Sequence, residues 1–211
     1  MKINKQAFGV ILSGGLSRRM GSDKSKMKIQ NHTLIELVIE KAKKQLRTLA
    51  INSNKPNDLV DNKYNLEIFE DSIKGNLGPL AGILSGMEWA REKDKQCKWV
   101  VFFPVDSPFF PDNLVEKFFE GLVNEKIVVA KSGERIHPVF SMWNIELIDS
   151  LRQSLKNNER KIDNFTKKIN SRLVKFPIIS YDPFFNVNYP SDLIKANKIF
   201  ELQNSIGDKL Q

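Results

Sequence analysis

Apolar runs alternate along the chain with amphipathic stretches, and this alternation predicts the order of strands and helices. Short continuous apolar runs are typical of strands that are buried on both faces of a sheet. They predict strands at residues 8–12, 49–51, 66–69, 99–103 and 127–130. Apolar positions at helical spacing predict helices at residues 33–45, with Thr33 as N-cap, 79–92 and 111–123. Strands that alternate with helices favour an α/β fold with a mostly parallel sheet.

The pattern is less regular toward the C-terminus. It predicts an extended segment at residues 135–143, helices at 145–155 and 160–169, a strand at 173–176 and a terminal helix from about Ser191 to Leu202. Near the start, residues 27–30 read as a short extended piece that turns at Asn31-His32. No repeat, low-complexity stretch or linker divides the sequence, so we expect residues 1–211 to form one domain.

Composition narrows the class of protein. The 211 residues are 41% hydrophobic and 27% charged, which is ordinary for a globular domain. The net charge of +8 fits an enzyme for phosphorylated substrates; the lysines are scattered and lack interleaved aromatic residues, so we expect no nucleic-acid partner. The single cysteine, Cys97, excludes an internal disulfide, and no apolar run approaches the ~20 residues of a membrane span. We therefore expect a cytoplasmic protein without membrane contact.

The first predicted strand ends in a loop suited to phosphate. Ser13-Gly14-Gly15 leaves backbone N–H groups open to an anion, and Arg18, Arg19 and Lys24 follow. A glycine pair alone is more often an ordinary turn. Neither a Walker loop nor a dinucleotide fingerprint is present, because two residues separate Gly21 from Lys24 and G-x-G-x-x-G is absent. The loop is a different candidate for binding a nucleoside triphosphate.

Three further polar side chains follow predicted strands. Asn52, Asp71 and Asp106 stand where ligands gather in open α/β sheets, outside the carboxyl ends of the strands. Each alone is as well explained as a turn residue. Asp106 lies between two prolines, where its carboxylate is well placed to bind Mg²⁺; the alternative is an N-terminal cap of the helix expected from Pro111.

Several motifs together resemble one family. The segment Leu12-Ser13-Gly14-Gly15, continued by Arg19-Met20-Gly21-x-Asp23-Lys24, resembles the signature loop of molybdenum cofactor guanylyltransferases, although the family usually has Ala at position 13 and often one more residue before the aspartate. Pro104–Pro108 resembles the family's metal-binding Pro-x-Asp-x-Pro turn. The family's Gly-Pro-Leu-Ala-Gly, His-Pro and Asn-x-Asn segments correspond to residues 78–82, 137–138 and 186–188. The resemblance extends from Gly9 to about Leu193.

This resemblance implies a single Rossmann-like three-layer domain that transfers GMP from GTP to the phosphate of molybdenum-molybdopterin and releases pyrophosphate. Mg²⁺ on Asp106 and the side chain of Lys24 would act at the α-phosphate, and Arg19 with the Gly14-Gly15 amides would hold the leaving phosphates. The other binding residues that it implies are Leu12 and Ser13 in the loop, Asp71 with Asn52 at guanine, and His137, Asn186 and Asn188 at the pterin. Molybdoenzyme chaperones and other cofactor-biosynthesis proteins are candidate partners.

Other functions fit parts of the pattern. The same chemistry would serve a molybdopterin cytidylyltransferase or a sugar-phosphate nucleotidyltransferase. A nucleic-acid binder without activity would rely on the net charge of +8. A nucleotide sensor with an inactive site is a third possibility, but Lys24 and Asp106 are both present. His137 has a structural alternative, a ring bonded to the backbone, and Arg160 and Lys161 either meet the acceptor phosphate or belong to a solvated helix face.

Overall fold

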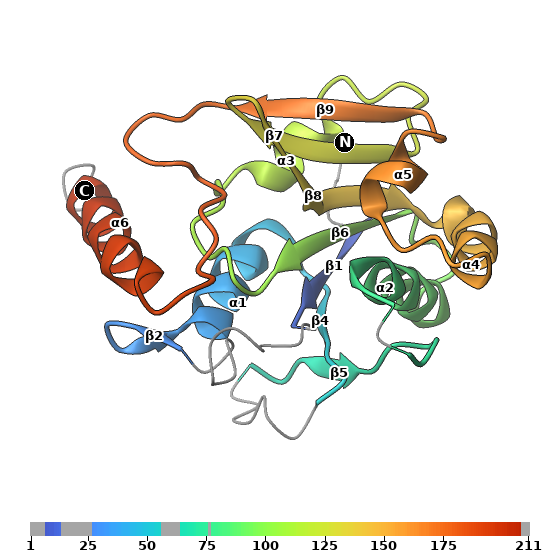
Figure 1. Ribbon diagram of the computed structural model, residues 1–211, viewed down its shortest axis with the longest axis horizontal. Helices are drawn as coiled ribbons and strands as arrows, with labels where there is room; N and C mark the ends of the chain where they lie inside the picture. The colour runs from blue at the N-terminus through green and yellow to red at the C-terminus, as the bar shows by residue number, and fades with distance from the viewer. Residues whose placement is uncertain (1–6, 14–26, 56–63, 76, 208–211) are drawn as a thin grey trace.

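A central sheet organises the part of the chain that the computed structural model describes, which is residues 7–13, 27–55, 64–75 and 77–207. Within these residues the strands of the main sheet follow the order β5-β4-β1-β6-β8-β7-β9 (Figure 1). β8 runs antiparallel to both of its neighbours, and the other pairs are parallel. The strands are β1 (Ala7–Leu12), β4 (Leu49–Asn52), β5 (Glu67–Phe69), β6 (Trp99–Pro104), β7 (Ile127–Ser132), β8 (Arg135–Asn144) and β9 (Ser171–Phe176). The expected mostly parallel sheet is confirmed.

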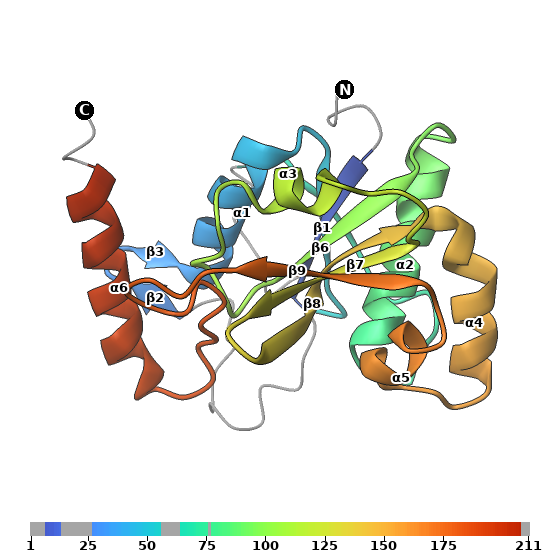
Figure 2. The ribbon, with the colours of Figure 1, turned by 90° about the horizontal axis from the view of Figure 1, so that it is seen from above.

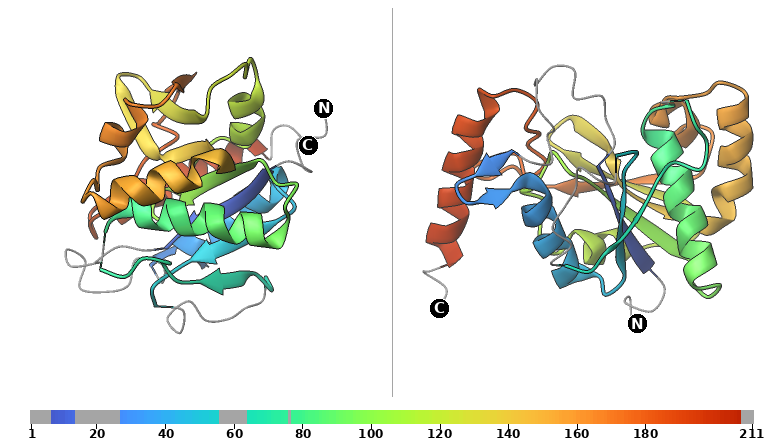
Figure 3. Two further views of the ribbon diagram at one scale, coloured as in Figure 1. Left: turned by 90° about the vertical axis from the view of Figure 1, so that its right-hand side faces the viewer. Right: turned by 90° about the horizontal axis from the view of Figure 1, so that it is seen from below.

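Helices cover both faces of the sheet, so the fold has three layers (Figure 3). The helical elements are α1 (Leu34–Gln45), α2 (Pro79–Lys93), α3 (Leu114–Phe119), the 3₁₀ turn η4 (Ile145–Leu147), α4 (Ile148–Lys156), α5 (Ile162–Thr166) and α6 (Asp192–Gly207). Of these, α6 packs against β2 outside the main sheet. Side chains that alternate along each central strand enter different cores. Ile11 and Phe103 pack with α1 and α3, whereas Val10 and Phe102 pack with α2, α4 and α5. Burial on both faces explains why these strands read as continuous apolar runs.

The start of α1 was predicted from its cap. Thr33 Oγ1 accepts a hydrogen bond from Glu36 N (3.3 Å), and Glu36 Oε2 accepts one from Thr33 N (2.8 Å). This reciprocal capping box satisfies two amides that the helix itself leaves unpaired. At the other end, Gln45 donates to Pro111 O (3.0 Å) and accepts from Val115 N (2.9 Å). The first helix therefore also fixes the beginning of α3.

Several predicted boundaries were wrong, for local reasons. α3 is shorter than the expected 111–123 because Pro111 belongs to a turn that precedes it and Gly121, at φ +65°, follows its end. α5 spans only Ile162–Thr166 of the expected 160–169. β9 begins two residues earlier than expected, and α6 continues to Gly207 rather than ending near Leu202.

A third apolar cluster joins the end of the chain to its beginning. The hairpin β2 (Lys28–Ile29) and β3 (His32–Thr33) turns at Gln30, one residue earlier than expected. α6 packs against this hairpin (Figure 2), with Ile199 in the same cluster as Ile29. Asn197 Oδ1 accepts a hydrogen bond from Gln30 N (3.1 Å), which fixes the register of this contact. Among the described residues, no helix combines the length and apolarity needed to cross a membrane.

Candidate active site

The carboxyl ends of four parallel strands are joined by backbone hydrogen bonds that continue beyond the sheet. Val105 N donates to Leu12 O (3.1 Å), Ser13 N to Asn52 O (2.9 Å), and Ser53 N to Phe69 O (2.9 Å). These bonds bring the residues after β1, β4, β5 and β6 to one edge. The predicted residues Leu12, Ser13, Asn52, Asp71 and Asp106 therefore belong to one continuous set of strand ends.

Asp106 occupies the turn after the central strand. Ser107 N bonds to Pro104 O (3.4 Å) within this turn, and the buried Ser107 hydroxyl lies 3.5 Å from Asp106 Oδ1. Val187 N donates to Asp106 O (2.8 Å), so a segment far along the chain holds the same turn. No cluster of three or more His, Cys, Asp or Glu side chains suited to a metal occurs among the described residues. The Asp106 carboxylate is the kind of ligand that fits Mg²⁺, which binds one or two carboxylates, water and substrate phosphates.

Asp71 is oriented by two asparagines. Its Oδ1 accepts from Asn52 Nδ2 (3.1 Å) and its Oδ2 from Asn54 Nδ2 (2.8 Å), while its backbone N–H donates to Asn54 Oδ1 (2.9 Å). Asn52 is buried. Because each carboxylate oxygen has two lone pairs, both oxygens retain capacity for a ligand that donates two hydrogen bonds. The sequence interpretation paired Asp71 with Asn52 and missed the role of Asn54, which lies two residues further in the same loop.

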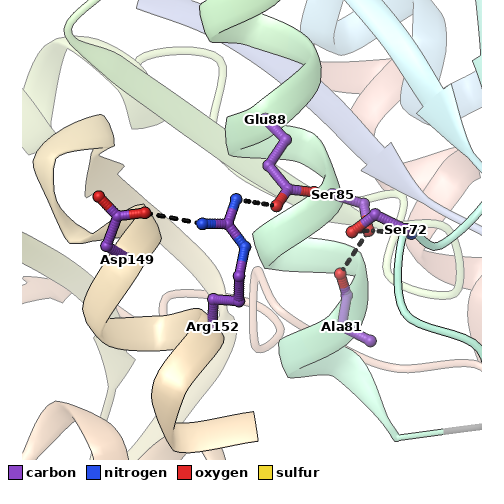
Figure 4. Close-up of polar contacts among 6 residues, drawn as sticks. All are labelled: Ser72, Ala81, Ser85, Glu88, Asp149 and Arg152. Carbon is purple, nitrogen blue, oxygen red and sulfur yellow. Dashed lines mark hydrogen bonds and ion pairs between the residues drawn. The ribbon is translucent and has the colours of Figure 1, made fainter. Parts of the chain in front are cut away.

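Helix α2 holds the loop after Asp71 in place (Figure 4). Ser85 Oγ accepts from Ser72 N (2.8 Å) and donates to Ala81 O (2.8 Å). Arg152 on α4 bonds to Glu88 on α2 (2.6 Å) and thereby joins these two helices; it also bonds to Asp149 on its own helix (2.7 Å). The loop that carries Asp71 is thus tied to the helical layer beneath it.

Gly82, the last residue of the Gly-Pro-Leu-Ala-Gly segment, lies within α2 and has a steric role. A Cβ atom at Gly82 would lie 2.6 Å from Asn52 Oδ1 and 3.0 Å from a Leu12 methyl group. At Gly86, one helical turn later, it would lie 2.6 Å from the Phe102 ring. The two glycines let the helix backbone approach the strand ends closely, and Gly82 does so at the side chain that orients Asp71.

His137 belongs to a buried chain of side-chain hydrogen bonds. Its Nε2 lies 2.7 Å from Ser132 Oγ, and Ser132 Oγ donates to Asp182 Oδ1 (2.8 Å). Burial lowers the pKa of His137, Asp182 opposes that shift, and Arg135 adds to it. The Phe184 ring lies tilted against the imidazole, with 4.6 Å between the ring centroids. The Ser132 hydroxyl is the hydrogen-bond partner of the ring in the described part of the chain, where no bond to a backbone group occurs.

The Asn-x-Asn segment is held on both sides. Val187 N bonds to Asp106 O, as described above, and Asp192 Oδ2 accepts from Asn188 N (2.8 Å) and Tyr189 N (2.9 Å). Asn186 Oδ1 is buried and has no hydrogen-bond partner in the described part of the chain. A buried carbonyl oxygen without a partner is costly, and a bound donor would satisfy it.

Four predicted site residues, Gly14, Gly15, Arg19 and Lys24, lie outside the described residues. Their assignment to the triphosphate stays a prediction, supported by the position of β1, whose last residue, Leu12, is followed in the sequence by Ser13 and Gly14. The sequence interpretation also missed Ser132 and Asp182. They are isolated polar residues fifty positions apart, and the bulge that changes the β7–β8 register between Val129 and Ala130 gives no local sequence signal.

A mostly parallel three-layer fold with a glycine loop after its first strand and a carboxylate after its central strand defines an α/β nucleotidyltransferase domain. Residues 9–172 match the family described as MobA-like NTP transferase domain, and the chain belongs to this family. It is 38% identical over 192 residues to the molybdenum cofactor guanylyltransferase of Rhodopseudomonas palustris (strain HaA2), covering 89% of each chain.

Solved structures agree on the fold. The molybdopterin-guanine dinucleotide biosynthesis protein A of Archaeoglobus fulgidus superposes with a TM-score of 0.72 at 24% identity, over 92% of this chain and 98% of that one. A Mycobacterium tuberculosis protein, solved as a complex with manganese, superposes with a TM-score of 0.59 at 11% identity, over 83% and 90% of the two chains.

Proposed function

We propose that this chain transfers GMP from GTP to the phosphate of molybdenum-molybdopterin, forming the guanine dinucleotide form of the cofactor and pyrophosphate. The observation that carries the proposal is the joining of the β1 and β6 ends, where Val105 N bonds to Leu12 O. This contact brings Asp106 to the same edge of the sheet as Ser13, which directly precedes the glycine loop in the sequence. The relative described above, which aligns over most of both chains, is named for the same activity.

The chain's own residues position the reactants, and no protein nucleophile is needed. The acceptor's phosphate oxygen attacks the α-phosphorus of GTP, the bond to the β-phosphate oxygen breaks, and pyrophosphate leaves. Asp106 would hold a divalent ion, with Mg²⁺ as our assignment, which offsets charge that accumulates on the phosphates when bound. Lys24 is assigned to the α-phosphate, and Arg19 with the Gly14-Gly15 amides to the leaving group.

Asp71 is our candidate for reading the base. Its carboxylate accepts two hydrogen bonds from the N1 and N2 edge of guanine but only one from the exocyclic amine of cytosine. Because Asn52 and Asn54 bond to opposite oxygens of the carboxylate, its plane is already fixed before a base arrives. This preorganised acceptor pair supports GTP over CTP.

The acceptor side is assigned to His137, Asn186 and Asn188. Asn186 Oδ1, which has no hydrogen-bond partner among the described residues, fits the N–H donors of a fused heterocycle. Molybdoenzyme chaperones and other cofactor-biosynthesis proteins are proposed to receive the product, and residues 1–211 are proposed to act as one domain.

The test is release of pyrophosphate from the purified chain with molybdopterin and Mg²⁺, comparing GTP with CTP. The proposal expects release with GTP and strong preference over CTP. Preference for CTP would instead favour a cytidylyltransferase. Release that requires a sugar phosphate would move the chain to a different acceptor, and absence of release with every acceptor would favour a binding role.

A further inference from the structure

Three polar side chains meet near the turn of the β7–β8 hairpin. Ser132 closes β7, His137 lies on β8 opposite Ala130, and Asp182 lies in the loop after β9. Ser132 is 1% exposed and His137 is 8% exposed, so their hydrogen bonds are shielded from water. A buried series of hydrogen-bonded side chains is stable only when each donor faces an acceptor.

The direction of each hydrogen bond follows from the carboxylate. An ionised carboxylate only accepts, so the Ser132 proton points to Asp182 Oδ1 at 2.8 Å. The Ser132 oxygen must then accept from the ring, and His137 Nε2, at 2.7 Å, carries the hydrogen. In a neutral imidazole this arrangement leaves Nδ1 as the acceptor. No hydrogen-bond partner for Nδ1 occurs in the described part of the chain.

The same carboxylate oxygen organises the neighbouring segment. Asp182 Oδ1 also accepts from Phe184 N (3.0 Å), and Asp182 O accepts from Phe185 N (3.0 Å). This turn leads directly to Asn186, whose buried Oδ1 has no partner among the described residues. Asp182 thus positions two acceptor atoms that have no hydrogen-bond partner among the described residues. One is His137 Nδ1, which it positions through Ser132, and the other is Asn186 Oδ1, which follows its turn.

We propose that Ser132 and Asp182 are positioning residues for the acceptor substrate: they hold His137 as the Nε2–H tautomer, so that His137 Nδ1 and Asn186 Oδ1 accept hydrogen bonds from N–H groups of a fused nitrogen heterocycle. The proposal rests on the proposed function for the identity of that heterocycle, molybdopterin. A hydroxyl and a carboxylate that touch no substrate would then decide how well the acceptor is bound.

The tautomer is measured by nitrogen NMR on the full chain labelled with ¹⁵N-histidine. The sequence contains two histidines, so His32→Gln assigns the spectrum. Wild type is expected to show a protonated Nε2 and an unprotonated Nδ1 on His137. Ser132→Ala removes the oxygen that accepts from Nε2–H and is expected to give a mixture of tautomers. Ser141→Ala, another buried serine of the same sheet, is the matched control and should leave the His137 signals unchanged.

Binding is measured by separate titrations with molybdopterin and with Mg·GTP. Ser132→Ala and Asp182→Ala each remove a hydrogen bond from the series that orients the His137 ring. Because this loss is worth about one hydrogen bond, molybdopterin binding should weaken roughly tenfold, while GTP affinity should stay within about twofold. Asp182→Asn keeps an oxygen for Ser132 and Phe184 N, so it should retain the wild-type tautomer and most of the affinity.

The proposal would be overturned by an Nδ1–H tautomer of His137 in wild type or by unchanged His137 signals in Ser132→Ala. An equal loss of affinity for molybdopterin and for GTP in the variants would also overturn it. Altered signals with unchanged molybdopterin affinity would also reject the role in acceptor binding. Failure of wild type to bind molybdopterin would instead contradict the proposed function, and the spectrum alone would then decide whether the two residues fix the ring.

Discussion

The two halves of the sheet build their parts of the site in different ways. In β5-β4-β1-β6, backbone hydrogen bonds continue from strand to strand, and polar residues simply follow each strand end. In β8-β7-β9, one strand is reversed and its register changes, and the functional groups are held by side chains such as Ser132 and Asp182 that lie fifty residues apart. The first half depends on topology, and the second depends on individual side chains.

This difference predicts how each half responds to substitution. A substitution of a polar residue at a strand end of the parallel half should strongly lower the rate of nucleotidyl transfer. The fold should persist in such a variant, because backbone hydrogen bonds hold these strand ends together. Changes in the reversed half should alter the orientation of a few groups and leave the nucleotide side nearly intact. The following substitutions test that division, from the largest expected effect to the smallest.

Asp106→Ala should lower the rate of pyrophosphate release by about 10²–10³-fold, because the ion that offsets phosphate charge loses its proposed ligand. The thermal midpoint should change little, since Asp106 lies in a turn outside the apolar cores. Asp112→Ala, which removes an exposed carboxylate paired with Lys41, is the control and should keep full activity. If Asp106→Ala retains activity, Asp106 is not the ligand of the metal ion.

Asp71→Asn should lower kcat/KM for GTP by about 10–100-fold, because it places an amide donor where Asn52 and Asn54 already donate and removes one acceptor for guanine. The measurement is competition between GTP and CTP in one reaction. Glu70→Gln, a neighbouring exposed change, should keep the wild-type preference. If Asp71→Asn keeps full GTP preference, another residue reads the base.

Gly82→Ala and Gly86→Ala compare the same change at two turns of α2. The added methyl at position 82 meets Asn52 Oδ1, so KM for GTP should rise about tenfold. At position 86 it meets the Phe102 ring, so the thermal midpoint should fall while KM stays within about twofold. Steady-state kinetics and thermal unfolding separate the two outcomes, and identical behaviour of the two variants would contradict the assignment of Asn52 to the site.

Cys97→Ala should change activity by less than about twofold, because Cys97 precedes β6 at the end of the strand opposite Asp106. Burial raises the pKa of its thiol to about 11, so a thiol reagent at pH 8 should react slowly with the folded chain and rapidly after denaturation. Because the folded pKa is raised, this group's contribution to stability is lost as pH rises toward 11. Rapid labelling of the native protein would show that this end of the strand opens.

The sequence predicted the parallel half well because its signals are local. Continuous apolar runs, the Thr33 cap and polar residues after strands each depend on neighbours in the chain, and they predicted the positions of Asn52, Asp71 and Asp106 at the strand ends. Asn54 was missed because a loop asparagine has an ordinary local explanation. Ser132 and Asp182 were missed because their meaning comes from a contact across fifty residues, which no periodicity records.

The packing of α6 on the β2–β3 hairpin has a consequence for synthesis on the ribosome. The hairpin lies early in the sequence, yet Ile29 is covered by α6, a helix of 16 residues that begins at Asp192. During translation, Ile29 therefore lacks this cover until α6 has left the ribosome. A product that terminates before Asp192 would leave this apolar surface exposed, and chaperones or proteases would act on it.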